Sequence, residues 1–457
     1  MIHYEVRLTC PPKHHSRAEA GHYRTRVWLV LVSDMRPRKG DNMQIGSRRM
    51  RFVVTGATIV WLIGVALVRG GTGMSTSAAA ASAIPSNKKA ERGTVLSDAC
   101  GRPGFVQAGA QAGPPQPQRP QMSEEAFKNV QVLKGIPVDE FMGAMGLFSA
   151  ALSMCCLECH APDWAADTPR KRTARKMVQM VETINRTNFT GRKVVSCWTC
   201  HRQSDRPQVT PSLDVVYGEP IYWAPDDLFQ QAAGAPSPGQ VLDKYIQAVG
   251  GAERLAKLTS FVGKGKATGY AGSFPSPAEI YVKAPNQRTT IIHTEVGNKT
   301  MTFDGRAGWL ASPVTPVPVM DLTGGELDGA RLDAELSIPG RVKQVLGQWR
   351  ASLPSDIAGR PVNVLQGTGA GGAVATLYFD VESGLLKRVV RYANSAMGRV
   401  PTQIDFDDYR AVAGVKVPFR WSFAWVSGRD VVELSEVQPN VAIDAAKFAK
   451  PAPAVPR

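Results

Sequence analysis

The sequence contains Cys156-Leu-Glu-Cys-His160 and, further along, Cys197-Trp-Thr-Cys-His201. Each stretch is Cys-x-x-Cys-His, the pattern that attaches a c-type haem. In this chemistry the two cysteines form thioethers with the porphyrin, and the histidine is the proximal ligand of the iron. We therefore expect two covalently bound haem c groups, attached and ligated by Cys156, Cys159, Cys197, Cys200, His160 and His201.

The overall composition allows several domains and excludes some functions. The chain has 457 residues, enough for two or three domains, and a formal net charge of +15. About half of that charge lies in residues 1–51, and haem propionates would lower the remainder. We therefore do not interpret the basic balance as nucleic-acid binding. Of the 7 cysteines, four belong to the two motifs, so the protein is not built on a disulfide framework.

The N-terminal region has the features of an exported protein. Residues 1–49 lack sustained periodicity, and we expect them to be unstructured or to precede the true start codon. Residues 50–83 form a signal sequence or membrane anchor, in which a basic start precedes an apolar run at 52–68 and a small-residue cleavage site. This predicts a periplasmic protein, and the run at 52–68 is either cleaved off or anchors it to the inner membrane. Residues 84–121 form a Pro/Gln-rich linker.

We predict a small helical domain over residues 122–210. A helix begins at Pro137 and carries an apolar stripe into the first motif. A second helix follows Pro169, and a short strand at Val194 and Val195 leads into the second motif. Lys171, Arg172, Arg175 and Lys176 crowd the start of that second helix; they form either a solvated face or a site for haem propionates or an acidic redox partner.

Histidine is too scarce to supply the sixth ligands of both irons. After the signal, the histidines are His160, His201 and His293, and His293 lies in a predicted strand of another domain. Methionine is the alternative ligand, and Met/His ligation raises the reduction potential. The candidates precede the motifs, although core packing also explains a methionine at helical spacing. They are Met145, Met177 and Met180.

Residues 131–203 resemble the cytochrome c subunit of photosynthetic reaction centres. The phrases Thr173–Asn185 and Val195–Arg202 carry the likeness. In that family, a helix bearing the axial methionine precedes each Met-ligated haem motif. The resemblance therefore implies that Met145 and Met177 are the axial ligands, and that Met180 is not. That family normally carries four haems, so this chain resembles a two-haem relative that takes part in electron transport.

A second linker, residues 211–235, leads to an antiparallel β domain at 236–450. The domain begins with a helix at 239–249 and contains a helical insertion at about 326–349. Alternating apolar residues predict eight strands: 278–283, 288–293, 299–303, 374–381, 385–392, 402–407, 417–426 and 431–437.

The β domain resembles lipoprotein-localisation (LolA/LolB-like) half-barrels, on the phrases Tyr378–Arg388 and Asp408–Pro418. This resemblance implies a curved sheet that holds acyl chains. Four tryptophans either line such a cavity or belong to an ordinary core: Trp309, Trp349, Trp421 and Trp425. The Gly-x-Gly-x-x-Gly at 367–372 is followed by a predicted strand and not by a helix, so we expect a loop and no dinucleotide site.

Together these features predict a multidomain protein: a small α-helical dihaem cytochrome c domain followed by an antiparallel β half-barrel of α+β class. Its expected function is electron transfer between unidentified redox partner proteins, with membrane association and without enzyme activity or nucleic-acid binding. Three alternatives remain. They are a four-cysteine zinc site, a haem peroxidase with an open iron, and a redox sensor or lipid-binding or other ligand-binding envelope protein acting through the β domain.

Overall fold

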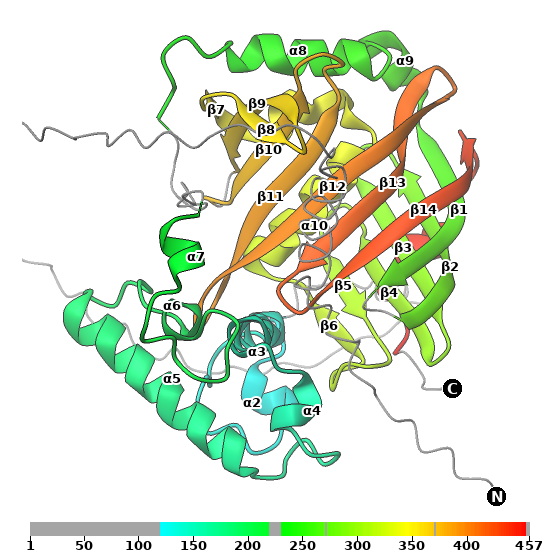
Figure 1. The fold of residues 1–457 in the computed structure, drawn as a ribbon. Helices are drawn as coiled ribbons and strands as arrows, with labels where there is room; N and C mark the ends of the chain where they lie inside the picture. The colour runs from blue at the N-terminus through cyan, green and yellow to red at the C-terminus, as the bar shows by residue number, and fades with distance from the viewer. Residues whose placement is uncertain (1–118, 219–229, 270–271, 370–371, 454–457) are drawn as a thin grey trace, which may run out of the picture. The chain divides into compact units, whose positions relative to one another are not determined.

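The computed structural model describes residues 119–218, 230–269, 272–369 and 372–453 (Figure 1). The predicted start, signal sequence and almost all of the first linker lie outside these ranges. All described residues belong to one of the two compact units into which the chain divides. Within the described ranges, no helix has the length and apolar character needed to span a bilayer.

Short and long helices occupy the chain ahead of the sheet. The two long helices are those predicted: α3 begins directly after Pro137, and α5 has Pro169 at its first turn and the Thr168 hydroxyl accepting from the Lys171 N–H. The complete set is α2 (Ser123–Ala126), α3 (Val138–Leu152), α4 (Cys156–Cys159), α5 (Pro169–Asn188), α6 (Cys197–His201), α7 (Leu213–Val216), α8 (Pro238–Ala248) and α9 (Ala252–Lys257).

The predicted strand at Val194 and Val195 is wrong, because one side chain takes the hydrogen bonds that a partner strand would make. The Asn185 amide group donates to the Val195 carbonyl at 2.8 Å. Its oxygen accepts the N–H groups of Val194 at 3.1 Å and Val195 at 2.9 Å. The segment is therefore extended and fixed to α5 without joining a sheet.

An antiparallel sheet follows, as predicted, but it has 14 strands and not the eight that the pattern predicted. Its order is β6-β5-β4-β3-β2-β1-β14-β13-β12-β11-β10-β9-β7, with β8 paired to β9. The strands are β1 (Ser260–Gly269), β2 (Gly272–Lys283), β3 (Gln287–Thr294), β4 (Gly297–Phe303), β5 (Gly308–Ala311), β6 (Val319–Asp321), β7 (Gly347–Ala351), β8 (Ser355–Ile357), β9 (Arg360–Thr368), β10 (Val374–Asp380), β11 (Leu386–Ser395), β12 (Gly398–Val412), β13 (Val415–Trp425) and β14 (Gly428–Pro439).

Two long helices pack against this sheet, α10 (Gly324–Ser337) from within the β domain and α3 from the helical segment (Figure 1). Helix α10 contacts β3, β4, β5 and β11, and it fills the first half of the predicted helical insertion. The second half contains a 3-10 turn (Pro339–Arg341), the short helix α11 (Val342–Val345) and the start of β7. Helix α3 contacts β11 and β12, so the helical segment and the sheet share an interface.

Two glycines bring α3 close to the sheet. A Cβ on Gly143 would lie 3.3 Å from the Ser395 Cβ, and a Cβ on Gly146 would lie 2.6 Å from both the Trp425 ring and the Val426 side chain. The second distance is too short for a real contact with a rigid indole ring. Gly146 therefore sets how closely α3 approaches β13.

Gly146→Ala should destabilise the protein by about 1–3 kcal/mol, the usual cost of overpacking. The measurement is the denaturant midpoint of the purified protein. Gly239→Ala in α8 is the matched control, because nothing lies within 4 Å of its added Cβ and alanine has the higher helix propensity. A denaturant midpoint for Gly146→Ala that is equal to or above that of the unaltered protein would contradict the tight α3–β13 contact.

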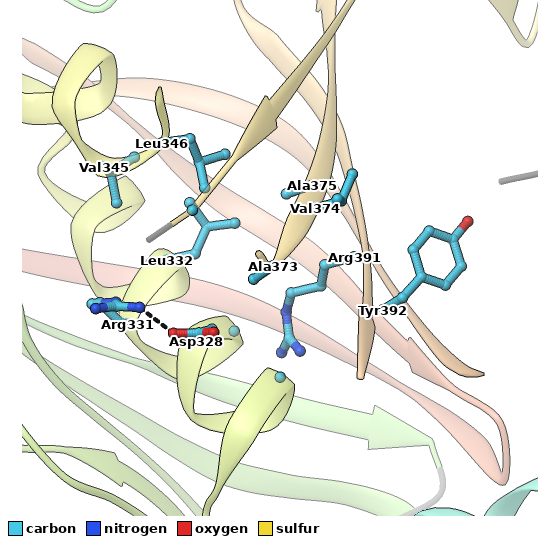
Figure 2. Close-up of a pocket in the computed structure, with 13 residues that line it drawn as sticks. Asp328, Arg331, Leu332, Val345, Leu346, Ala373, Val374, Ala375, Arg391 and Tyr392 are labelled. Carbon is cyan, nitrogen blue, oxygen red and sulfur yellow. Dashed lines mark hydrogen bonds and ion pairs between the residues drawn. The ribbon is translucent and has the colours of Figure 1, made fainter. Parts of the chain in front are cut away.

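An ion network is buried between α10 and β11. The Arg391 guanidinium lies 3.3 Å from both the Glu326 and the Asp333 carboxylates, and the Arg391 side chain is 4% exposed. Burial disfavours this charge, but attraction to the two carboxylates outweighs it and raises the pKa of Arg391. Figure 2 shows Arg391 extending from β11 towards α10. The small cavity drawn there measures about 20 Å³, room for about one water molecule.

Arg391→Met should destabilise the fold by about 3–5 kcal/mol, because it leaves two carboxylates buried without their cation. Thermal or urea unfolding measures this loss. Arg410→Met tests the specificity of the effect: Arg410 pairs with Asp408 at 2.5 Å on the surface, where such pairs contribute about 0–1 kcal/mol. If both variants lose a similar, small free energy of unfolding, the buried Arg391 network does not stabilise the fold more than a surface ion pair does.

The glycine-rich stretch at 367–372 connects two strands, as predicted. β9 ends at Thr368 and β10 begins at Val374. The Gly369 N–H donates to the Ala373 carbonyl at 2.7 Å. No helix N-terminus follows the glycines, so the structure lacks the strand–loop–helix context of a dinucleotide site here.

Candidate haem sites

The first motif folds as a single helical turn. In α4 the Glu158 carboxylate accepts the Cys155 N–H at 2.6 Å, and the His160 N–H donates to the Cys156 carbonyl at 2.9 Å. Residues three apart on a helix lie on the same side, so Cys156 and Cys159 share one side of the turn. This arrangement suits two thioether bonds to one porphyrin.

His160 has the state that an iron ligand needs. Burial lowers the pKa of its imidazole, and the nearby Lys171 cation lowers it further, so the ring is neutral at pH 7. Its Nδ1 is buried and has no hydrogen-bond partner among the described residues. The ring packs beside Trp164 at a centroid distance of 4.8 Å. A buried, neutral imidazole keeps one unprotonated nitrogen, which fits a haem iron.

The second motif is also a single turn. The Thr199 hydroxyl accepts the Ser196 N–H at 3.0 Å and so caps α6. His201 Nδ1 lies 2.9 Å from the Ser204 carbonyl. Because a carbonyl can only accept, Nδ1 carries the proton and Nε2 keeps its lone pair for a metal. This is the tautomer that a proximal haem ligand requires.

The cysteines do not gather into a zinc site. Among the described residues, no three His, Cys, Asp or Glu side chains lie close enough together to hold a metal ion. Burial raises the pKa of Cys197 to about 11 and also raises that of Cys159. Zinc binds thiolates, so neutral thiols held in two separate motifs fit thioether formation better than a four-cysteine site.

The two predicted axial methionines, Met145 and Met177, differ in exposure and in whether they line the cavity beside the first motif. Met145 lies on α3, half-buried, and lines the same cavity as His160. Met177 on α5 is 38% exposed and Met180 is 43% exposed, and neither lines that cavity. The structure therefore places Met145 and His160 on one cavity, and it does not distinguish Met177 from Met180 as a ligand.

A large cavity adjoins the first motif. Its volume is about 740 Å³, within the range of small-molecule sites. Met145, Phe148, Cys159 and His160 line its helical end. Residues of α10 and of strands β3, β4, β5, β6, β12, β13 and β14 line its other side, which we call the sheet end. Sequence reasoning had suggested a cavity lined by tryptophans, and Trp421 and Trp425 do line this one; Trp309 and Trp349 do not.

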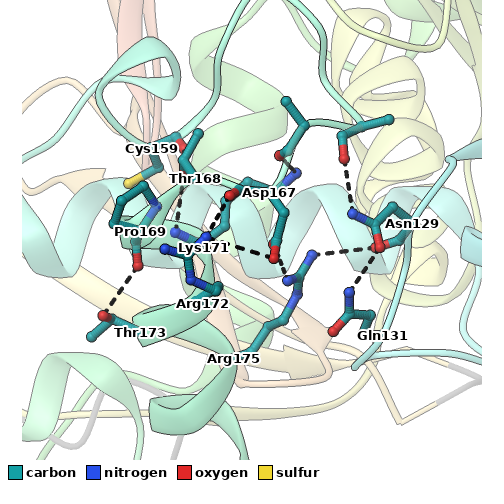
Figure 3. Close-up of polar contacts among 12 residues, drawn as sticks. Asn129, Gln131, Cys159, Asp167, Thr168, Pro169, Lys171, Arg172, Thr173 and Arg175 are labelled. Carbon is teal, nitrogen blue, oxygen red and sulfur yellow. Dashed lines mark hydrogen bonds and ion pairs between the residues drawn. The ribbon is translucent and has the colours of Figure 1, made fainter.

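The basic cluster at the start of α5 holds the loop that follows the first motif (Figure 3). The Lys171 ammonium donates to the Trp164 and Ala166 carbonyls, at 2.8 Å each. Arg175 pairs with the Asp167 carboxylate, and Arg172 donates to the Asp167 carbonyl at 2.7 Å. These three cations are therefore engaged within the protein. The sequence pattern had suggested only a solvated face or an external site.

A second contact of the same loop reaches the motif itself. The Thr168 hydroxyl donates to the Cys159 carbonyl at 2.6 Å while it caps α5. The Arg170 guanidinium donates to the Glu158 carbonyl at 2.7 Å. Helix α5 thus fixes the orientation of α4, and with it the direction of the Cys156 and Cys159 side chains.

Comparison with known proteins matches the segment that carries both motifs. Residues 83–215 match the family described as the photosynthetic reaction centre cytochrome C subunit. The photosynthetic reaction center cytochrome c subunit of Thermochromatium tepidum is 34% identical over 92 residues, which is 19% of this chain and 23% of that protein. The chain therefore spans about a quarter of the length of this curated relative.

Solved structures with a similar arrangement cover about half of the chain. A DUF1329 family protein from Desulfovibrio piger aligns with 46% of this chain and 97% of its own, at 13% identity and a TM-score of 0.33. A LolA superfamily protein from Nitrosomonas europaea aligns with 47% of this chain and 99% of its own, at 14% identity and a TM-score of 0.30.

The family match confirms the resemblance of the motif segment to reaction centre cytochrome c subunits. At this level it supports a cytochrome c class of protein and an association with electron transport. Covalently bound haem is the cofactor of that class. The residues of both motifs fit this cofactor, through the paired cysteines on one turn, the neutral imidazole of His160 and the His201 contact that leaves its Nε2 for a metal.

Proposed function

We propose that this protein is an exported electron carrier with two haem c groups. One observation carries the proposal: each Cys-x-x-Cys-His folds as a single capped turn whose histidine is kept neutral or held in the metal-binding tautomer. A bound haem c supplies a one-electron iron couple.

The chain's own residues have distinct roles in this proposal. Cys156 and Cys159 hold one porphyrin, and Cys197 and Cys200 hold the other. His160 and His201 are the proximal ligands, and Met145 and Met177 are the distal ones, on helices α3 and α5. Sulfur ligation from methionine favours the reduced iron and raises the potential. Protein redox partners and a periplasmic location, with the run at 52–68 as signal or anchor, complete the proposal.

A reductive titration of the protein, produced in a bacterium that matures cytochromes c, tests this function. We expect a sharp α-band on reduction, two one-electron steps, and no change when carbon monoxide is added to the reduced protein. Carbon monoxide binding to the unaltered protein would instead indicate an open iron, as a peroxidase needs. A colourless protein containing zinc would contradict the proposal altogether.

A further inference from the structure

The cavity beside the first motif extends further than the iron ligands. Cys159, His160 and Met145, which the proposed function assigns to one haem, line this cavity. Arg288 on β3 and Asp333 on α10 line its sheet end. A porphyrin tethered to α4 would lie beside the helices and would leave the sheet end to a second molecule.

Three aromatic side chains form a platform along one wall of the cavity. Trp421, Phe423 and Trp425 alternate along β13, so they point to the same face of the sheet. All three line the cavity. Aromatic side chains favour a flat ring stacked or tilted against them, beyond the apolar area that is buried. Ile292 on β3 and Met301 on β4 add further apolar lining.

The sheet end also presents one enclosed donor and one unsatisfied acceptor. Arg288 donates to the Asp333 carbonyl at 3.1 Å and to the Ser337 hydroxyl at 3.4 Å. It has no carboxylate within ion-pair distance among the described residues, and burial lowers its pKa. Asp333 is 8% exposed, and its Oδ1 is buried without a hydrogen-bond partner. A buried acceptor left unpaired destabilises the protein, and a hydrogen bond from a ligand hydroxyl would recover that loss.

We propose that the sheet end of this cavity binds an apolar quinone or hydroquinone, with its ring on the β13 platform. The Arg288 guanidinium donates to a ring oxygen, and Asp333 Oδ1 accepts from a ring hydroxyl in the reduced form. The choice of a redox-active ring, rather than another aromatic alcohol, rests on the proposed function, because the site shares its cavity with Met145 and His160.

Equilibrium dialysis of the oxidised holoprotein with decylubiquinone tests the site without any electron transfer. We expect saturable binding of one molecule per chain. Ile292→Trp fills the cavity and should weaken binding at least 10-fold. Ile291→Trp is the matched control: Ile291 neighbours Ile292 on β3 but points to the opposite face and does not line the cavity, so binding should be unchanged. Binding of dodecanol, which has an alkyl chain but no ring, is measured in parallel and distinguishes a site for acyl chains from a site for a ring.

A smaller substitution tests the same site with less risk of unfolding the protein. Phe423→Leu keeps the wall apolar but removes a ring, and it should weaken decylubiquinone binding several-fold while haem content and the reduced spectrum stay unchanged. The proposal is overturned if dodecanol binds and decylubiquinone does not, or if the two-haem protein binds neither. The haem content of every sample is measured in parallel with decylubiquinone binding. A protein without two haems contradicts the proposed function, whereas a two-haem protein that does not bind decylubiquinone contradicts only this site.

Discussion

Replacing both Cys156 and Cys159 with alanine should lower the haem content of the mature protein from two per chain to one. The two thiols share one side of α4, and Cys155, the N-cap of the same turn, lies outside the Cys-x-x-Cys-His pattern. Without thioethers, only the iron's bonds to His160 and to the proposed ligand Met145 would retain this porphyrin, and denaturation breaks both bonds. Pyridine haemochrome absorbance, divided by protein concentration, gives the ratio after denaturation.

Leu157→Ala is the control for this double variant. Leu157 occupies the same helical turn, is 39% exposed and has no role in attachment, so this variant should keep two haems. The matching double variant at Cys197 and Cys200 should also retain one haem, and the two single-haem proteins should differ in spectrum. An unchanged ratio in either double variant would show that the corresponding motif does not attach a haem.

Met145→Ala should lower the reduction potential of one haem and open its iron to carbon monoxide. Met145 and His160 line one cavity, and a thioether ligand stabilises the reduced iron. The expected drop is on the order of 0.1 V or more, a fraction of the ~0.8 V over which axial ligands set haem potentials. A spectroelectrochemical titration separates the shifted haem from the unshifted one.

Met142→Ala is the control for the methionine experiment. Met142 lies on the same helix and lines the same cavity, so it loses a similar apolar side chain without removing the predicted ligand. We expect its two potentials to remain near those of the unaltered protein. If Met142→Ala and Met145→Ala shift a potential equally, packing explains the effect and Met145 is not the ligand.

Local chemistry made part of this fold predictable from the sequence. Pro169 and Thr168 define the start of α5 by proline geometry and hydroxyl capping. Most of the long strands were predicted because their apolar residues alternate, but β1 and β9 were missed. Short strands such as β5 and β6 show too few alternations to be recognised. The error at Val194 arose because a β-branched pair predicts a strand, whereas the Asn185 side chain had already satisfied that backbone.

The candidate site was predictable only where its residues are neighbours in the sequence. The Cys-x-x-Cys-His turns needed no tertiary information. The cavity depends on contacts between distant segments: Gly146 against Trp425, and Arg288 beside Asp333. A pair of glycines three residues apart in an apolar helix is a weak signal of close packing. Nothing in the sequence indicated that this packing faces β13, so the sheet's part in the site could not be predicted.

The intact mass of the mature protein under denaturing conditions tests the central claim most directly. When the unaltered chain is made in a host that matures cytochromes c, its mass should exceed that of the polypeptide by two haem groups, because thioether bonds survive denaturation. A mass equal to the polypeptide alone, from a host that loads a control cytochrome c, would contradict the account.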